Sequence, residues 1–376
     1  MSNYPDGMSR YGLIHVGDVR QGLQTLDAGS VQTCITSPPY WGLRDYGTAS
    51  WDGGDPECEH TISAKDADGK AVFSERVTRG KRSECLQCGA TRVDAQLGLE
   101  STPEEYVENM VAVFREVRRV LADDGTLWLN LGDSYWGGKG ANGTSKALGN
   151  AAERGYAQPR GTLVTPMRPS DGKHEVIKPK DLVGIPWRVA FALQADGWYL
   201  RQDIIWAKPN PMPESVRDRC TKSHEYVFLL TKSQRYYYDH EAIKEPITAP
   251  QSRITRAGAS DEQKVAYRGN APTNLVRCGT PNDTRNKRDV WTINTKPFKG
   301  AHFAVMPEAL VEPCILAGSK AGDTVLDPFT GSGTVGVVAK RHGRNFVGTE
   351  LNPEYAAIAE QRIAGEPENL FGGTNA

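Results

Sequence analysis

Short apolar runs alternate with helical patterns along most of the 376 residues of this chain. The runs Tyr11–Val16, Val31–Thr36 and 126–131 have the length and composition of strands, and residues 19–26 between the first two predict a helix. Strands separated by helices are typical of a mainly parallel sheet that is covered on both faces. The alternation continues with strands at 198–206, 226–230, 324–326 and 345–348 and helices at 181–193 and 335–340.

The region after residue 101 has the clearest amphipathic pattern. Thr102 is a residue type that caps helix N-termini, Pro103 suits the first helical position, and Glu104 and Glu105 place acids at the positive end of the helix dipole. The helix that follows is expected to bury one stripe of apolar residues spaced by three and four: Tyr106, Met110, Val113, Phe114, Val117, Val120 and Leu121.

Three polar segments interrupt this alternation. Residues 51–94 contain little apolar sequence, residues 137–178 are rich in glycine, asparagine, serine, arginine and proline, and residues 241–299 are polar and basic. Polar segments of this length within a compact domain are typically functional or mobile. We therefore predict one core built from residues 11–50, 95–240 and 300–365, with an insert at 51–94, a flexible loop at 137–178 and a separate region at 241–299.

Charge and hydropathy argue against a uniformly basic nucleic-acid-binding protein and against a membrane or secreted protein. The chain has 45 lysine and arginine residues against 46 aspartate and glutamate residues, so a nucleic-acid partner would have to be bound by a local basic surface. No apolar run approaches the roughly 20 residues of a membrane span, and the first ten residues lack the apolar core of a signal peptide. We expect a soluble, cytoplasmic protein with no membrane partner.

Four candidate metal ligands lie in the first insert. Cys85 and Cys88 have the two-residue spacing that lets two thiolates bind one ion, and Cys58 and His60 precede them. Such a set suits a structural zinc ion, which would stabilise a segment with few apolar residues. Reduced thiols beside an exposed histidine are the alternative. Seven cysteines, an odd number in a long chain, argue against a disulfide framework.

A glycine-rich turn follows the strand at 324–326. Residues 327–334 read Asp-Pro-Phe-Thr-Gly-Ser-Gly-Thr, and such a turn exposes N–H groups at a helix start, where a ligand can approach the backbone. Gly331, Gly333 and Gly336 also fit the Gly-x-Gly-x-x-Gly spacing of dinucleotide-binding proteins, with Glu350 placed to hold ribose hydroxyls. Asp327 favours a different ligand, because its carboxylate can bind an ammonium group, which a pyrophosphate lacks.

A second unusual sequence ends the strand Val31–Thr36. In Ser37-Pro38-Pro39-Tyr40 the two prolines fix the backbone and remove two N–H donors, so the carbonyls of Ser37 and Pro38 should point outward. Rigid acceptors beside an aromatic ring suit the exocyclic amine of a nucleobase, which can stack on the ring. A polyproline turn with a packed tyrosine is the alternative.

Together these two sequences resemble the motifs of the S-adenosylmethionine-dependent DNA amino-methyltransferases. In that family the Ser-Pro-Pro-Tyr tetrapeptide is the catalytic motif, and the form that begins with serine is more common among cytosine-N4 than adenine-N6 enzymes. The segment 302–304, His-Phe-Ala, resembles the form common beside Ser-Pro-Pro-Tyr and also favours cytosine. The catalytic motif precedes the cofactor motif, an order that resembles the circularly permuted beta group. The resemblance covers residues 12–363 apart from the cysteine insert and the loop 137–178.

The resemblance implies a Rossmann-like α/β fold and transfer of a methyl group from S-adenosylmethionine to N4 of a flipped cytosine in double-stranded DNA. Adenine N6 is the alternative target, and a cognate restriction endonuclease is a candidate partner. The catalytic residues would be Ser37, Pro38, Pro39 and Tyr40. The residues in contact with the cofactor would be Asp18, Asp327, Phe329, Gly331, Ser332, Gly333, Thr334, Glu350 and Asn352.

Basic residues in two regions are candidates for DNA contacts. Residues 251–300 contain ten lysine or arginine residues against four acids, which suits target recognition, although a solvated basic linker is the alternative. The loop 137–178 would be either a flap over the DNA or a mobile insert. The candidate DNA contacts are Lys208, Arg217, Arg219, Lys222, Arg253, Arg256, Arg285, Lys287 and Arg288.

Three other interpretations are weighed against this one. Pro313-Cys314 matches the pair that carries the nucleophile of cytosine-C5 methyltransferases, but no second motif supports it, so we expect a buried thiol. A zinc-stabilised DNA-binding protein without catalysis would not need the Ser37 tetrapeptide. A nicotinamide-dependent oxidoreductase would use the glycine turn for NAD.

Overall fold

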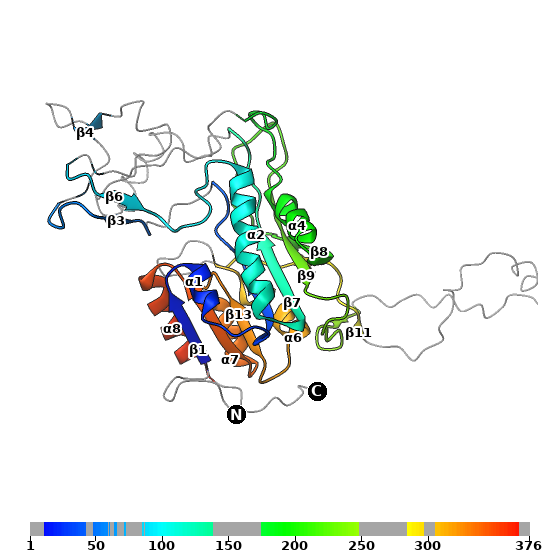
Figure 1. The fold of residues 1–376 in the computed structure, drawn as a ribbon. Coiled ribbons are helices and arrows are strands. Elements are labelled where there is room, and N and C mark those ends of the chain that lie inside the picture. Colours follow the sequence, from blue (N-terminus) through cyan, green and yellow to red (C-terminus); the bar gives the residue numbers. More distant parts are fainter. Residues whose placement is uncertain are drawn as a thin grey trace, which may run out of the picture.

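A sheet of eight strands forms the centre of the molecule (Figure 1). Its strands follow the order β1-β14-β13-β2-β7-β9-β8-β12. β9 is antiparallel to both of its neighbours, whereas the remaining pairs in the sheet are parallel, so the mainly parallel α/β sheet predicted from the sequence is confirmed. The strands are β1 (Tyr11–Val16), β14 (Asn345–Glu350), β13 (Thr324–Asp327), β2 (Val31–Thr36), β7 (Leu121–Leu131), β9 (His224–Thr231), β8 (Tyr199–Ala207) and β12 (Val290–Thr292).

The computed structural model describes residues 11–42, 48–58, 60, 64–65, 71–72, 85, 87–137, 174–247, 284–296 and 305–367. Several sequence predictions lie outside these residues: the segment 302–304, most of the loop 137–178, and Arg253 and Arg256 in the basic region. Among the helices of the described ranges, none is both long and apolar enough to cross a membrane.

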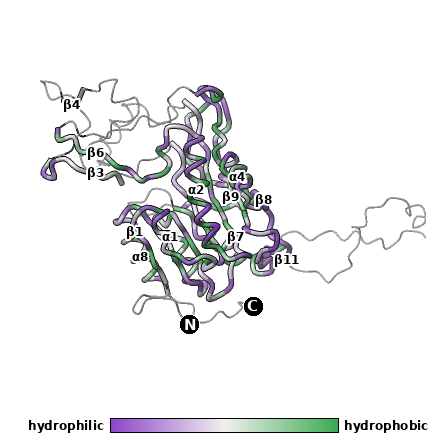
Figure 2. Tube along the Cα trace, in the orientation of Figure 1, coloured by the Kyte–Doolittle hydropathy of each residue, from purple (hydrophilic) through white to green (hydrophobic). Residues whose placement is uncertain are grey.

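Helices cover both faces of the sheet, and each face has its own buried apolar cluster. Because side chains alternate along a strand, Leu127 and Leu129 of β7 point into the cluster on one face and Trp128 points into the cluster on the other. Hydrophobic and hydrophilic positions follow one another along α2, which covers the sheet (Figure 2). The first face carries α1 (Val19–Gln24), α2 (Pro103–Val120) and α4 (Ile185–Ala195), and the second carries α6 (Glu308–Gly318), α7 (Thr334–Arg341) and α8 (Pro353–Gly365).

The helix predicted after residue 101 is α2. The Thr102 side chain accepts a hydrogen bond from the backbone N–H of Glu105 at 3.1 Å, which confirms the predicted N-cap. All seven residues of the predicted apolar stripe are buried. The strand expected at 126–131 extends back to Leu121, because Leu121 pairs with Val31 of β2 beyond a register shift.

Short strands lie outside the main sheet. β3 (Ser50–Asp52) and β6 (Thr91–Val93) form an antiparallel ribbon in the predicted insert, and in Figure 1 this ribbon lies well away from β1 and the helices α1 and α8. β4 (Ala64–Lys65) pairs with β5 (Ala71–Val72), and β10 (Glu245–Pro246) pairs with β11 (Thr284–Arg285).

The helix predicted at 181–193 begins four residues later, in α4. Gly184 has a φ of +79°, a left-handed conformation that an ordinary helical residue does not adopt. Its N–H and that of Ile185 both donate hydrogen bonds to Asp133 Oδ1 at 3.0 Å. Asp133 follows β7, so this helix receives its capping carboxylate from a distant strand, which local sequence patterns do not reveal.

Replacing Asp133 with alanine is expected to lower the free energy of unfolding by about 1 kcal/mol, the usual effect of losing a helix cap. Asp133→Asn keeps an oxygen acceptor for Gly184 and Ile185 and should recover much of the loss. Denaturant unfolding of both variants measures the difference. Equal stability of Asp133→Ala and the parent protein would show that the cap contributes nothing.

Candidate active site

One cleft of about 800 Å³ lies where the parallel strands end. Residues that follow β2, β7 and β8 line it, among them Ser37, Gly132 and Lys208. The reversed strand β9 begins at the same edge and contributes Glu225. Strand ends at one edge of a parallel sheet are the usual position of a binding site in open α/β folds. Asp18, Asp327 and Glu350, at the ends of β1, β13 and β14, line the same cleft.

The two sequence motifs meet in this cleft through one hydrogen bond. Thr36, the last residue of β2, donates from its hydroxyl to Asp327 Oδ1 at 2.6 Å. β2 and β13 are adjacent parallel strands, with Val325 paired to Thr33. The tip that begins at Ser37 and the turn that begins at Asp327 are therefore held side by side, although 291 positions separate the bonded residues.

Asp327 is a buried carboxyl group, with 2% of its surface exposed. Burial raises its pKa to about 7, and the nearby charge of Glu350 adds to this effect, while the hydrogen bonds from Thr36 and the Phe329 N–H oppose it. A cationic ligand group beside this carboxyl would favour its ionised form. Ionisation of Asp327 is therefore energetically unfavourable in the empty cleft and becomes favourable when a cationic group binds beside it.

Glu350 is the second acid of the cofactor side. Its Oε2 accepts a hydrogen bond from the Gly331 N–H at 2.8 Å, and its Oε1 accepts one from the Asn352 N–H at 2.9 Å. Burial raises its pKa. Because Glu350 already holds an N–H of the glycine turn and adds negative charge there, the turn is a poor site for a pyrophosphate. The dinucleotide interpretation is therefore disfavoured by the geometry.

The glycine turn is shaped by close packing on α8. Gly333 has a φ of +79°, and a Cβ on it would lie 2.8 Å from the Cβ of Ala359. A Cβ on Gly336 would lie 2.3 Å from Ile363, so this third glycine serves helix packing. Arg362 of α8, which sequence analysis missed, donates to the backbone carbonyl of Ser332 and, at 3.0 Å, to its hydroxyl.

The remaining predicted cofactor residues divide into two groups. Phe329, Ser332 and Thr334 line the cleft, as does Asp18, whose side chain caps α1 by accepting from the Arg20 N–H at 2.8 Å. Asn352 instead caps α8, accepting from the Glu354 N–H at 2.9 Å, and is absent from the described lining of the cleft. A helix cap is therefore the role that the geometry gives to the side chain of Asn352.

The Ser37–Tyr40 tip ends in a polar network. The Tyr40 hydroxyl lies 2.8 Å from Glu225 Oε2 and 3.0 Å from Asn130 Oδ1, and the Ser37 hydroxyl lies 3.3 Å from it. Lys208 forms an ion pair with the other oxygen of Glu225, and both side chains are only 16% exposed. Burial and the charge of Glu225 raise the pKa of Tyr40 well above its usual value, so its hydroxyl stays protonated and can donate.

The backbone carbonyls of Pro38 and Pro39 in the tip differ in whether they accept a hydrogen bond from the described protein. The Pro39 carbonyl accepts a hydrogen bond from the Tyr106 hydroxyl at 2.9 Å. No residue of the described ranges donates to the carbonyl of Pro38, the position at which the sequence predicts an outward acceptor. Pro38 therefore keeps a carbonyl that can accept a proton of a ligand amine.

Residues 31–361 match the N6/N4 methyltransferase family model, which is described as DNA methylase. The chain belongs to this DNA methylase family. The methylase is 43% identical over 361 residues to the type II methyltransferase M.Cfr9I of Citrobacter freundii, a match that covers 94% of this chain and 88% of that protein. It is 43% identical over 350 residues to M.SmaI of Serratia marcescens, covering 93% and 90% of the two chains.

The fold of the methylase also resembles that of a DNA methyltransferase of known structure. The PvuII DNA methyltransferase, described as cytosine-N4-specific, superposes on the methylase with a TM-score of 0.53 over 96% of this chain and 88% of that chain. At 16% sequence identity this comparison concerns the fold, and it agrees with the predicted methyltransferase-type sheet. The resemblance inferred from the two motifs is thus confirmed at the level of the family.

Asn130, Gly132 and Glu225 are among the residues of the methylase site that sequence analysis missed. Asn130 is the polar residue within the apolar run at 126–131, and Gly132 follows that run directly. Glu225 immediately precedes the apolar run at 226–230. A polar residue inside or beside a buried strand is a usable signal, because a buried polar group needs partners and a site supplies them.

Gly132 leaves the space that the Tyr40 ring occupies. A Cβ at residue 132 would lie 2.5 Å from Cε2 and 2.8 Å from Cδ2 of that ring. We therefore expect Gly132→Ala to displace the ring and to lower methyl transfer about tenfold or more, the effect of an overpacking strain of 1–3 kcal/mol. Cofactor affinity, measured by calorimetry, should change little. Full activity in the alanine variant would show that the ring can move without cost.

The candidate DNA contacts fall into different environments. Lys208 and Lys222 lie in the cleft, where Lys222 donates to the carbonyl of Asp133 at 2.8 Å and burial lowers its pKa. These partly buried positions differ from the surface expected of phosphate contacts and suit a ligand inside the cleft instead. Arg217 is exposed, as a phosphate contact would be. Arg219 stacks 4.0 Å from the Tyr135 ring and pairs with Glu214.

The basic region is described only in part. Arg285 and Arg288 both bind Oε1 of Glu245, at 2.8 and 2.7 Å. Lys287 lies 5.0 Å from the centre of the Trp291 ring. The bond between Arg285 and Glu245 joins β11 to β10, and all three cations have partners within the protein. A DNA role for them stays a prediction.

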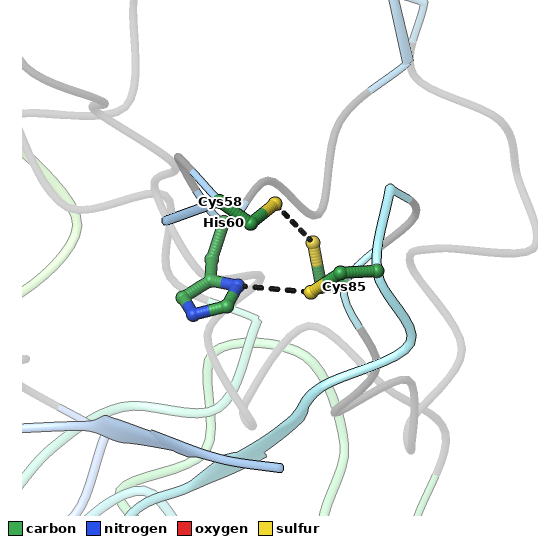
Figure 3. A group of neighbouring side chains, drawn as sticks. Cys58, His60 and Cys85 are labelled. Atoms are coloured by element: carbon green, nitrogen blue, oxygen red, sulfur yellow. Dashed lines mark hydrogen bonds between the residues drawn. The ribbon is translucent and has the colours of Figure 1, made fainter. Parts of the chain in front are cut away.

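Cys58, His60, Cys85 and Cys88 gather in the insert, with their potential ligand atoms all within 4.8 Å of one another. Figure 3 shows the Sγ atoms of Cys58 and Cys85 facing each other, at 3.8 Å. The Cys88 Sγ lies 3.2 Å from His60 Nδ1. The four residues predicted as metal ligands are thus brought together, from segments on either side of the ribbon.

Cys314 is buried in α6, as the sequence predicts, and its Sγ donates to the Leu310 carbonyl at 3.3 Å. Burial raises the pKa of this thiol, so a nucleophilic thiolate is disfavoured. The cytosine-C5 interpretation has no support from the site.

Proposed function

We propose that the methylase transfers a methyl group from S-adenosylmethionine to the exocyclic N4 of a cytosine that is flipped out of double-stranded DNA. The observation that carries this proposal is the hydrogen bond from Thr36 to Asp327, which places the Ser37 tip beside the glycine turn in one cleft. Adenine N6 is the alternative target, because the same family transfers to both amines.

Two buried acids support a cationic cofactor. In this proposal Asp327 binds the ammonium group, Glu350 accepts from the ribose hydroxyls, and Asp18 lies at the adenine end. The carboxylates fit the positive charges of S-adenosylmethionine, and they oppose a pyrophosphate. The cofactor supplies a sulfonium methyl group that an amine can attack. The glycine turn around Gly331 and Gly333 lets it approach the backbone closely.

The tip prepares the amine in this proposal. The lone pair of an aromatic amine is delocalised into the base and is a poor nucleophile. Hydrogen bonds donated by the amine to the Pro38 carbonyl and the Ser37 hydroxyl localise that pair and aim it at the methyl group. The nitrogen forms the new bond to the methyl carbon, the carbon–sulfur bond breaks toward sulfur, and one amine proton is lost to an acceptor at the tip or to water.

Tyr40 forms the wall on which the base stacks. Its ring is supported by Gly132, and its hydroxyl is held by Glu225 and Asn130. A fixed ring costs little entropy when a base stacks on it. The ion pair between Lys208 and Glu225 balances charge at this wall, which suits a neutral base.

The preference for cytosine rests on Ser37 at the head of the tetrapeptide. Sequencing plasmid DNA from cells that express the methylase, with detection of modified bases, tests it and reads the recognition site together. Modified cytosines in a single sequence context are expected. Modified adenines in place of cytosines would establish the alternative target.

DNA recognition is assigned to residues 241–299 and to Arg217 on the loop after β8. The exposed cations Arg217 and Arg288 would contact phosphates. The core is assigned to residues 11–50, 95–240 and 300–365. The type II names of the relatives support a role in a restriction-modification system, with a cognate endonuclease as the partner.

A structural zinc ion is proposed for Cys58, His60, Cys85 and Cys88. The four donor atoms match a tetrahedral site in number, type and spacing. Metal analysis of the purified methylase should give about one equivalent of zinc per chain. A content far below one equivalent would contradict the site.

A further inference from the structure

The proposed zinc site lies at the outer end of a ribbon whose inner end forms part of the cleft. We propose that the metal holds the wall of the cleft beside Tyr40, so that transfer to DNA depends on zinc while binding of S-adenosylmethionine does not. This inference rests on the proposed function, because it divides the cleft into a target side and a cofactor side.

The geometry of the Cys85–Cys88 turn suits bound thiolates. The Gln87 N–H points to the Cys85 Sγ at 3.4 Å, the type of contact that stabilises a metal-bound thiolate. Gly89 has a φ of +74°, and its N–H donates to the Cys85 carbonyl at 2.9 Å. The turn is therefore formed by its own backbone, and both of its cysteines belong to the ligand group.

Gly54, which follows β3, packs against this turn. A Cβ on Gly54 would lie 2.7 Å from the Cys88 Sγ and 2.7 Å from the Cβ of Ala90, so only glycine fits there. The Trp51 ring lies 4.9 Å from the His60 ring. These contacts bring the Cys58–His60 segment to the turn, and a metal ion bound by both would link them more strongly.

The ribbon that joins the metal ligands to the core is short. β3 and β6 share three residue pairs, from Ser50–Val93 to Asp52–Thr91. An isolated two-stranded ribbon of this length is marginally stable in water. A zinc ion would hold the outer ends of the ribbon together. It would link Cys58 and His60, which follow β3, to Cys85 and Cys88, which precede β6.

The inner end of the ribbon forms the cleft wall. Asp94, directly after β6, accepts through Oδ1 from the Thr48 hydroxyl at 3.2 Å and from the Gln96 N–H at 3.1 Å. Thr48, Gln96 and Leu97 all line the cleft. The two chain segments that enter and leave the ribbon are thus tied together where they face the ligand.

The same wall touches the catalytic tip. The Gly98 carbonyl accepts from the Gly42 N–H at 2.8 Å, and a Cβ on Gly98 would lie 3.0 Å from the Tyr40 carbonyl oxygen. The Trp41 indole, which is 1% exposed, donates to the Glu100 carbonyl at 3.0 Å. A ribbon that opens would therefore release contacts that hold Tyr40 from behind.

The cofactor side is held by other elements. The side chains of Asp327 and Glu350 accept hydrogen bonds from Thr36, Phe329, Gly331, Leu351 and Asn352, and within the described ranges none of their partners comes from residues 48–98. These partners lie at the ends of sheet strands, which are buried between the helix layers. Loss of zinc should therefore leave this side in place.

Cys88→Ser tests the division, with Cys220→Ser as a matched control. Cys220 is an exposed cysteine outside the ligand group. Metal content is measured first, and then the spectrum after cobalt replaces zinc, which reports thiolate ligation and tetrahedral geometry independently of activity. Cofactor affinity is measured by calorimetry, and kcat and KM for duplex DNA are measured with labelled S-adenosylmethionine.

We expect Cys88→Ser to lose the metal and the cobalt spectrum and to bind S-adenosylmethionine within about threefold of the parent, a change of less than 1 kcal/mol. Its kcat/KM for DNA should fall at least tenfold, about 1.4 kcal/mol. In the wild-type chain, a chelator should produce the same loss and added zinc should reverse it. The control should keep metal, cofactor binding and activity.

Three results would overturn the inference: a wild-type chain without metal, loss of metal with unchanged kcat/KM, or an equal loss of cofactor affinity, which would mean general unfolding. Failure of the proposed function has a different signature. It appears in the wild-type chain with zinc bound, as methylated adenine or as no transfer at all.

Discussion

Replacing Asp327 with asparagine is expected to weaken binding of S-adenosylmethionine by at least about a hundredfold. The asparagine keeps the size of the side chain and an oxygen that can accept from Thr36, so the fold should persist. It removes the negative charge that would pair with the ammonium group, in a site where only 2% of the residue is exposed. Calorimetric titration of the cofactor measures the loss.

The pH dependence of this site has opposite signs for affinity and stability. Burial raises the pKa of Asp327 to about 7, so cofactor affinity should increase as pH rises through that value and the carboxyl ionises. The folded protein without cofactor holds this proton up to about pH 7, whereas the unfolded chain releases it near 3.9. Its stability should therefore fall between these values, by up to about 1.4 kcal/mol per pH unit from this group.

The asparagine variant should lose the part of both pH dependences that comes from Asp327, and at pH 8 it should be at least as stable as the parent without cofactor. Asp123→Asn is the matched control, because the Asp123 side chain is 98% exposed and its ion pair with Lys232 lies at the surface. Unchanged cofactor affinity in Asp327→Asn would remove the acid from the binding site. Equal effects of the two substitutions would point to a general loss of charge.

Replacing Ser37 with alanine is expected to lower kcat by about a hundredfold, the range found when one hydrogen-bonding partner of a reacting group is removed. Ser37 lines the cleft, and among the described residues its hydroxyl bonds to Tyr40 alone, whose own hydroxyl keeps Glu225 and Asn130. The fold and the affinity for S-adenosylmethionine should therefore stay close to those of the parent. Single-turnover transfer to duplex DNA measures the chemical step.

Ser30→Ala is a suitable control for this substitution, since the Ser30 hydroxyl donates to the Asp27 carbonyl in an exposed turn. A kcat for Ser37→Ala within about threefold of the parent would exclude the hydroxyl from the chemistry. A parallel loss of cofactor affinity would instead assign Ser37 to binding. Neither outcome would affect the membership of the chain in the methylase family.

The parts of the site that short motifs encode could be predicted from the sequence. Asp327 and the glycine turn predict the end of a strand followed by the start of a helix, and Ser37-Pro38-Pro39-Tyr40 predicts a rigid backbone segment. Parallel strands place such ends at one edge of a sheet, so their meeting in one cleft follows from the fold. The spacing of Cys85 and Cys88 likewise carries its own geometry, and the structure brings Cys58 and His60 to them.

The parts that depend on distant partners could not be predicted. Glu225 reaches Tyr40 because β9 runs antiparallel to β7 and starts where β7 ends. The apolar pattern of a strand does not indicate its direction in the sheet. Gly132 matters because of one ring that lies against it. Asp133 caps a helix more than fifty residues away, so the start of α4 could not be placed from its own sequence.

The expected use of Lys208 and Lys222 shows the limit of composition. Both are cations between apolar runs, as phosphate contacts often are, yet both lie in the cleft with partners of their own, Glu225 and the Asp133 carbonyl. The charge of a lysine does not show whether its side chain will lie on the surface or inside the cleft. A sheet register is needed, and that register comes from pairing across the fold.

The most direct test of the central claim is mass spectrometry of nucleosides from duplex DNA treated with the purified methylase and S-adenosylmethionine that carries a deuterated methyl group. The account predicts N4-methyldeoxycytidine with the full deuterium label, formed by the parent protein and lost in Asp327→Asn and Ser37→Ala. Labelled N6-methyldeoxyadenosine without N4-methyldeoxycytidine, or no labelled nucleoside with any duplex that contains the site found by sequencing, would contradict it.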